Sequence, residues 1–189
     1  YAEAHGRSFP EEEMQGLLKQ VMEKGEKIGL SNSSINYDWL DSGGVGIDRS
    51  YDRYPLLKGF VTGSRGGKPL APLLGDIKGY DGGTADMHIG PITFYLAYCD
   101  HVVIYHFKPL TLDTVACEIT WLVNERAEEG KDYSLKELIW LWDVTTIADK
   151  CIIENNQKGV NSRFYQPGPF TKMEEFEQGF VDWYMDLMK

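Results

Sequence analysis

Apolar positions repeat with different spacings along the chain, and each spacing predicts a different kind of element. The first spacing is helical. Pro10 suits a first helical turn, and the glutamates that follow it complement the helix dipole. We therefore expect an amphipathic helix over Pro10–Lys24, whose apolar stripe is Met14, Leu17, Leu18, Val21 and Met22.

The middle of the chain has the composition of a β-sheet. Aromatic and β-branched residues are concentrated in Ile89–Cys99, His101–Pro109 and Thr114–Val123. The linkers between these segments are short, and short linkers join antiparallel neighbours. We predict an antiparallel meander of strands. Residues 25–83, by contrast, hold Gly, Ser, Asp and Pro between short apolar runs, which predicts a loop-rich insert.

Helical spacing returns after Ser134. Ser134 and Glu137 form a capping-box pattern at the start of one helix. A second helix carries Asp149 and is expected to stop at Gly159, a residue type that often follows a helix.

A final helix is predicted to begin at a second capping box, formed by Thr171 and Glu174. Loops, then strands, then helices is the order of an α+β fold, in which an antiparallel sheet packs against helices gathered on one side. The chain of 189 residues is expected to form a single domain.

Asp149 is the most informative polar residue of the chain. At helical spacing it shares a face with apolar and small residues, namely Thr145, Ala148, Ile152 and Asn156. We expect that face to be buried. An ionised carboxylate there needs a cation, strong donors or a raised pKa, because an unpaired buried charge is costly. A metal ion would meet this need, and so would an arginine or a set of backbone N–H groups.

Nitrogen ligands for a metal could come only from four histidines. His101 and His106 form an HxxxxH pair, but residues five apart on a regular strand point to opposite faces of a sheet. We expect one of them at a loop edge and the other on a sheet face. His5 precedes the first helix and has no local pattern that favours a metal.

Composition excludes some classes of function. The formal net charge of −10 argues against a nucleic-acid partner. No apolar run approaches the roughly 18 residues of a membrane span, and the first residues do not form a secretory signal, so we expect a cytoplasmic protein. The cysteines form no CxxC or CxH pair, so this chain holds no thiolate zinc site and no Cys/His iron–sulfur motif.

Two long blocks carry a family resemblance. Residues 92–123 read ITFYLAYCDHVVIYHFKPLTLDTVACEITWLV, and residues 142–184 read WDVTTIADKCIIENNQKGVNSRFYQPGPFTKMEEFEQGFVDWY. Both resemble the catalytic domain of the α subunit of Rieske-type non-haem iron oxygenases, the ring-hydroxylating and quaternary-amine-oxidising family. The resemblance implies a helix-grip fold, START-like or Bet v 1-like, with a curved antiparallel sheet against C-terminal helices.

The resemblance also implies a metal site. In that family the Asp that precedes the Glu/Gln helix is an iron ligand, and it falls on Asp149. The other ligands are histidines spaced HxxxxH before a helix; His5 fits the second of them, and the first would precede Tyr1. Asn156, two turns beyond Asp149, is a candidate for lining the substrate pocket. Such a facial triad leaves positions on Fe(II) open for O2 beside the substrate.

Further expectations follow from the same resemblance. The family's N-terminal [2Fe–2S] Rieske domain has no counterpart in residues 1–189. Electrons would come from a reductase or ferredoxin through a Rieske cluster, usually that of the adjacent subunit in a homotrimer. A small aromatic or quaternary-amine substrate is expected, and aromatic residues of the insert could form a cation–π cage, with Tyr37, Trp39, Tyr51 and Tyr54 as candidates.

Two other classes of function compete with an oxygenase. A metal-free helix-grip module would bind a small apolar ligand and keep Asp149 as a structural acid. A hydrolase could use a His–Asp dyad, but no Ser or Cys nucleophile stands in a suitable motif. The distance between His5 and Asp149 separates these readings, because two ligands of one metal lie roughly 3–4 Å apart.

Overall fold

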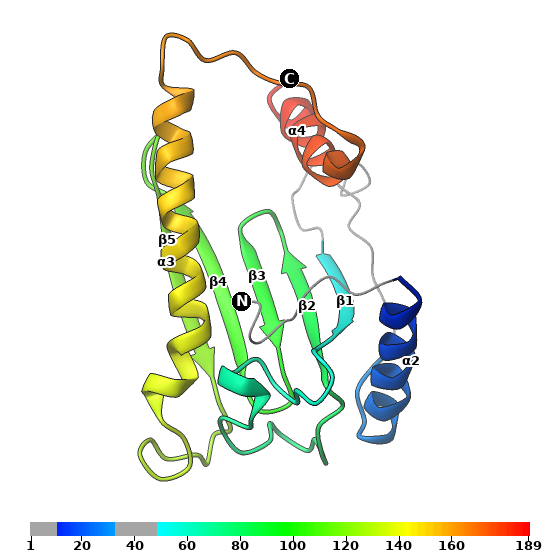
Figure 1. Cartoon of the computed structure of the whole chain (residues 1–189). Helices are drawn as coiled ribbons and strands as arrows, with labels where there is room; N and C mark the ends of the chain where they lie inside the picture. The colour runs from blue at the N-terminus through cyan, green and yellow to red at the C-terminus, as the bar shows by residue number, and fades with distance from the viewer. Residues whose placement is uncertain (1–10, 33–48) are drawn as a thin grey trace.

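A five-stranded antiparallel sheet forms the centre of the molecule (Figure 1). The computed structural model describes residues 11–32 and 49–189. Each strand pairs with its neighbours in sequence, so the sheet is a continuous meander. The strands are β1 (Arg49–Pro55), β2 (Gly83–Ile89), β3 (Thr93–Ala97), β4 (Val102–Pro109) and β5 (Val115–Leu122).

Helices surround the sheet unequally. Helix α2 (Glu11–Lys27) packs against β1, and a Cβ placed on Gly83 would lie 2.4 Å from Val21 Cγ1, so glycine is needed at this close approach. Helix α3 (Leu135–Val160) runs along β4 and β5 (Figure 1). The 3₁₀ turns η1 (Arg65–Gly67) and η2 (Lys172–Glu174) are short, and α4 (Glu175–Leu187) follows η2 beyond the end of the sheet.

The prediction of an α+β fold with an antiparallel meander is confirmed. Helix-grip closure of the sheet by several C-terminal helices stays a prediction, because α3 is the helix that covers the sheet and α4 contacts η2. The core lies between α3 and the sheet, and its fully packed members are Leu56, Tyr98, Val103, Leu141 and Trp142.

Two predicted boundaries were wrong. The segment Ile89–Cys99 is not one strand: Ile89 ends β2, Gly90 turns the chain with φ of +61°, and β3 begins at Thr93. Strand β2 begins at Gly83, the last residue of the predicted insert, and runs through residues 84–88, for which no element was predicted; the described part of the insert also contains β1.

The two helices predicted between Ser134 and Gly159 are one continuous helix. No Gly or Pro interrupts residues 135–158, and the β-branched residues near its middle lower helix propensity without breaking the helix. Thr145 Oγ1 donates to the Leu141 carbonyl within the same helix, at 2.9 Å. The second capping box is confirmed: the Thr171 N–H donates to Glu174 Oε2 at 2.8 Å.

Asp86 titrates near neutrality and gives the fold a pH dependence. Burial raises its pKa to about 6, against an opposing hydrogen bond from Thr84, and Asp52 directly opposite on β1 raises it further. A raised carboxyl pKa in the folded state means that stability is lost as pH rises from about 4, the unfolded value, to about 6.

We predict that Asp86→Asn raises the free energy of unfolding at pH 7 by about 1–2 kcal/mol, a figure reduced for partial solvent access. Urea unfolding of both proteins between pH 4 and 7 measures the effect. The stability difference is expected to widen with pH; a constant difference across that range would contradict the prediction. The same substitution at the exposed Asp76 is the control.

Candidate functional site

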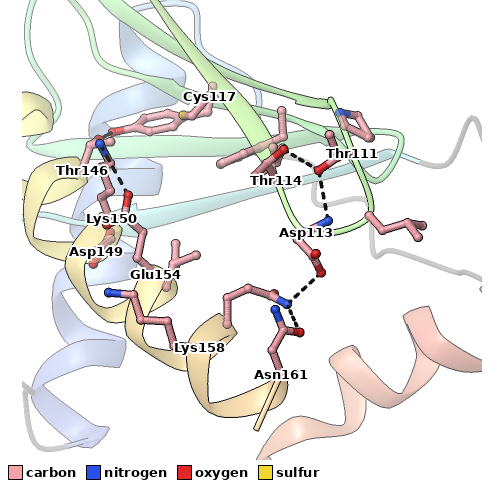
Figure 2. Close-up of a pocket in the computed structure, with 17 residues that line it drawn as sticks. Thr111, Asp113, Thr114, Cys117, Thr146, Asp149, Lys150, Glu154, Lys158 and Asn161 are labelled. Carbon is pink, nitrogen blue, oxygen red and sulfur yellow. Dashed lines mark hydrogen bonds and ion pairs between the residues drawn. The ribbon is translucent and has the colours of Figure 1, made fainter.

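A groove of about 880 Å³ separates the second half of α3 from β4, β5 and the hairpin that joins them. Figure 2 shows Asp149, Lys150, Glu154 and Lys158 on the helix wall. The hairpin, residues 110–114, forms the opposite wall, where the hydroxyls of Thr111 and Thr114 lie 2.6 Å apart.

Aromatic side chains form the floor of the groove. Tyr105 and Phe107 alternate on β4, and Cys117 on β5 is directly opposite Phe107. Phe107 also makes an edge contact with Phe94 on β3, with ring centroids 5.8 Å apart. This floor follows from the alternation of β4, which sends every second residue to the face that α3 covers.

The inner end of the groove is closed by a contact between sheet and helix. The hydroxyls of Tyr105 and Thr146 lie 2.6 Å apart, and the Tyr105 ring meets Trp142 edge-on with centroids 5.9 Å apart. Burial raises the pKa of Tyr105 to about 12, opposed by the Thr146 hydrogen bond and aided by nearby carboxylates that include Asp149. The Tyr105 hydroxyl therefore keeps its proton at physiological pH.

Asp149 lies on the helix wall but is not buried. The expectation of a buried face was wrong: Asp149 is exposed, and Ile152 and Ile153 are 68% and 58% exposed. Only the first half of α3 packs on the sheet, whereas its apolar stripe continues into the second half. There, no other described element covers the stripe. The carboxylate of Asp149 has no hydrogen bond or ion pair with any residue in 11–32 or 49–189.

The other predicted site residues are placed as follows. His5 lies outside the described residues, so its distance from Asp149 stays open. Asn156 is exposed and is not among the residues that line the groove. In the insert, Tyr51 donates to the Ser31 carbonyl at 3.1 Å and Tyr54 is 47% exposed; neither lines the groove, and Tyr37 and Trp39 also lie outside the described ranges.

His101 and His106 have separate surroundings, as the strand argument predicted. His101 is fully buried just before β4, where its Nδ1 lies 2.8 Å from Asp100 Oδ1. His106 Nδ1 lies 2.9 Å from Thr93 Oγ1, and the register places His106 on the sheet face opposite to Tyr105. His101 was expected at a loop edge; its full burial depends on the Asp100 carboxylate, which the local pattern does not reveal.

Among the described residues, no group of three or more His, Cys, Asp or Glu side chains lies close enough to hold a metal ion. Of the two iron ligands that the family resemblance implies for this chain, Asp149 lies in the described part of the chain and His5 does not. That ligand fits in chemistry: Asp149 offers a carboxylate at a groove wall that no side chain in 11–32 or 49–189 pairs with, and carboxylate oxygen is a donor type found in non-haem Fe(II) sites.

Sequence reasoning missed Tyr105 and the hairpin. The alternation of β4 was visible in the sequence, but the identity of the helix above it was not.

No helix in the described ranges combines the length and the hydropathy that a membrane crossing requires.

Comparison with known proteins adds the family. Residues 58–189 match the family described as ring hydroxylating alpha subunit (catalytic domain). The chain is 35% identical over 167 residues to the glycine betaine monooxygenase oxygenase subunit of Pseudomonas aeruginosa (strain UCBPP-PA14). The matched stretch covers 87% of this chain and 37% of that protein. It is 36% identical over 138 residues to the subunit of the same name from Chromohalobacter salexigens, covering 72% of this chain and 31% of that protein.

The chain thus spans about a third of the length of these curated relatives. The family match extends over most of the described sheet, all of α3 and all of α4. The chain belongs to the α subunits of Rieske-type ring-hydroxylating oxygenases, and residues 58–189 correspond to their catalytic domain.

Proposed function

We propose that this chain is the catalytic domain of an oxygenase that activates O2 at a mononuclear non-haem Fe(II) and hydroxylates an aromatic or quaternary-amine substrate. The observation that carries the proposal is the carboxylate of Asp149 on the wall of a groove, where no residue of the described ranges pairs with it, in a chain of this family. Bound Fe(II) would supply the open coordination positions at which O2 reacts.

The chain's own residues would hold the metal and orient the substrate. We assign Asp149 and His5 as iron ligands. The groove beside Asp149 would hold the substrate against the aromatic floor of Tyr105 and Phe107. Asn156, which the family resemblance put forward for the substrate pocket, does not line this groove.

A quaternary amine would contact aromatic side chains in this groove, and aromatic faces attract a cation that has lost part of its water. The lining carries three carboxylates, on Asp113, Asp149 and Glu154, against two lysines, Lys150 and Lys158. The relatives from Pseudomonas aeruginosa and Chromohalobacter salexigens are named as glycine betaine monooxygenase subunits, which agrees with such a substrate.

Electron supply belongs to the proposal as well. Electrons would reach the iron from a Rieske [2Fe–2S] cluster outside residues 1–189, reduced by a reductase or ferredoxin, in a cytoplasmic homotrimer. Residues 1–189 would form one catalytic domain, with 25–83 as its insert.

Metal content tests the proposal. We expect the complete protein to bind stoichiometric Fe(II) under anaerobic loading, and Asp149→Ala to weaken binding by more than about 100-fold, beyond the range of outer-shell changes. Asp143→Ala is the matched control, because Asp143 is exposed on the same helix and does not line the groove. His5→Ala tests the second ligand by the same measurement.

Each result has a distinct meaning. Iron retained by Asp149→Ala would overturn the assignment of that ligand. Absence of iron binding by the unaltered protein would overturn the oxygenase proposal and favour a metal-free binding module.

A further inference from the structure

Helix α3 is fixed to the strands unevenly along its length. Leu138, Leu141 and Trp142 in its first half are buried in the core. The bond between Thr146 and Tyr105, at 2.6 Å, is the next side-chain hydrogen bond between the described part of the helix and the sheet. Beyond it, the only side-chain hydrogen bond from the described part of α3 to the sheet or its hairpins is a 3.5 Å contact from Gln157 to Asp113, in exposed surroundings.

The Tyr105–Thr146 bond lies less than one helical turn before Asp149. Thr146 precedes Asp149 by three residues, so both side chains are on the groove side of the helix, less than one turn or about 5 Å apart along its axis. Tyr105 is rooted in the middle of β4, between β3 and β5, and its ring is held by Trp142. A rigid strand thus contacts the helix immediately before the candidate ligand.

We propose that Tyr105 is a positioning residue, whose hydrogen bond to Thr146 fixes the turn of α3 that presents Asp149 to the metal. This inference rests on the proposed function. Its physical basis is that a metal site tolerates ligand displacements of only about 0.5 Å, so supporting contacts determine affinity. In the part of the chain that the structure describes, Asp149 itself has no hydrogen bond to orient it.

The role of this bond can be tested cleanly, because the bond can be removed with little repacking. Tyr105→Phe keeps the ring and its edge contact with Trp142, and besides the bond to Thr146 it removes a longer one, 3.5 Å from the hydroxyl to the Trp142 carbonyl. Both hydroxyls are only partly buried, so Thr146 can bind water once its partner is lost. The substitution therefore separates the placement of the helix turn from the packing of the core.

The test is Fe(II) affinity of the complete protein with Tyr105→Phe, Thr146→Val and both changes together. We expect each single variant to bind Fe(II) about tenfold more weakly, within the range of outer-shell changes. The double variant should bind no more weakly than either single variant, because both changes remove the same bond. The visible absorption of bound Co(II), which reports ligand geometry, should shift in all three variants.

Thr93→Val is the matched control. It also removes a threonine hydroxyl that bonds a β4 side chain, His106 at 2.9 Å, but on the face of β4 away from α3. We expect this control to leave Fe(II) affinity and the Co(II) spectrum unchanged.

The alternatives are separable. Equal weakening by Thr93→Val, unchanged affinity in Tyr105→Phe, or additive losses in the double variant would each overturn the positioning role while leaving Asp149 as a ligand. Iron retained by Asp149→Ala would overturn the proposed ligand, and the positioning role would fall with it.

Discussion

Replacing Asp81 by alanine is expected to lower the free energy of unfolding by about 3–5 kcal/mol, the usual cost of removing one partner of a buried ion pair. Asp81 pairs with Arg53, and the two side chains are 0% and 4% exposed. The same carboxylate accepts the Gly83 N–H at 3.0 Å and the Cys99 thiol at 3.4 Å. Without Asp81, the Arg53 charge stays buried, and no other carboxylate of the described residues forms an ion pair with it.

Urea unfolding measures this loss. Asp76→Ala is the control, because Asp76 is an exposed carboxylate in the same segment. Adding Arg53→Met to Asp81→Ala should restore part of the stability, since the stranded charge is then gone. A loss no larger than that of Asp76→Ala would show that the pair contributes no stability.

The second large effect is expected at Asp100, which holds residues 62–80 to the β3–β4 turn. Its carboxylate accepts hydrogen bonds from the Thr62 hydroxyl at 2.6 Å and the Leu70 N–H at 2.9 Å, and it lies beside the His101 ring. Asp100→Ala removes this acceptor from the buried Thr62 hydroxyl and from the partly buried Leu70 N–H. At about 1–3 kcal/mol for each unsatisfied group, we predict a loss of about 2–5 kcal/mol.

The pH dependence of this loss provides an additional check. Burial alone would raise the pKa of Asp100, but His101, the Leu70 N–H and the Thr62 hydroxyl outweigh burial and hold that pKa below its ordinary value. The stabilisation is therefore present above about pH 4 and is lost as pH falls through the folded pKa. The difference in unfolding free energy between the unaltered protein and Asp100→Ala should shrink in acid. The control Asp182→Ala, at an exposed carboxylate, should differ little from the unaltered protein at any pH. A difference for Asp100→Ala that does not change with pH would contradict the stabilising role of the Asp100 carboxylate.

Local patterns predicted the elements whose environment is local. The α2 stripe, β4, β5 and the second capping box followed from spacing and capping residues alone. Strand β1 escaped prediction because its sequence, RSYDRYP, places an arginine at an inward position. That arginine is buried only because Asp81 lies 28 residues away in sequence and next to it in space, a pairing that periodicity does not contain.

Some features of the candidate site could be predicted from local sequence, and others could not. Asp149 could be singled out from its helix and its family pattern, but its exposure could not. An apolar stripe predicts burial only if something covers it, and α3 extends beyond the core that covers its first half. Tyr105 could not be singled out because its role depends on which strand runs beneath the helix.

The unequal anchoring of α3 has a consequence for local unfolding. Opening the first half of the helix requires disruption of the main core, so its backbone amides share the global stability of the fold. The second half has mostly exposed apolar side chains and can fray from Val160 inward at a fraction of that free energy. Local stability is therefore expected to fall along a single helix towards the mouth of the groove, and the Tyr105–Thr146 bond lies between its buried half and its exposed half.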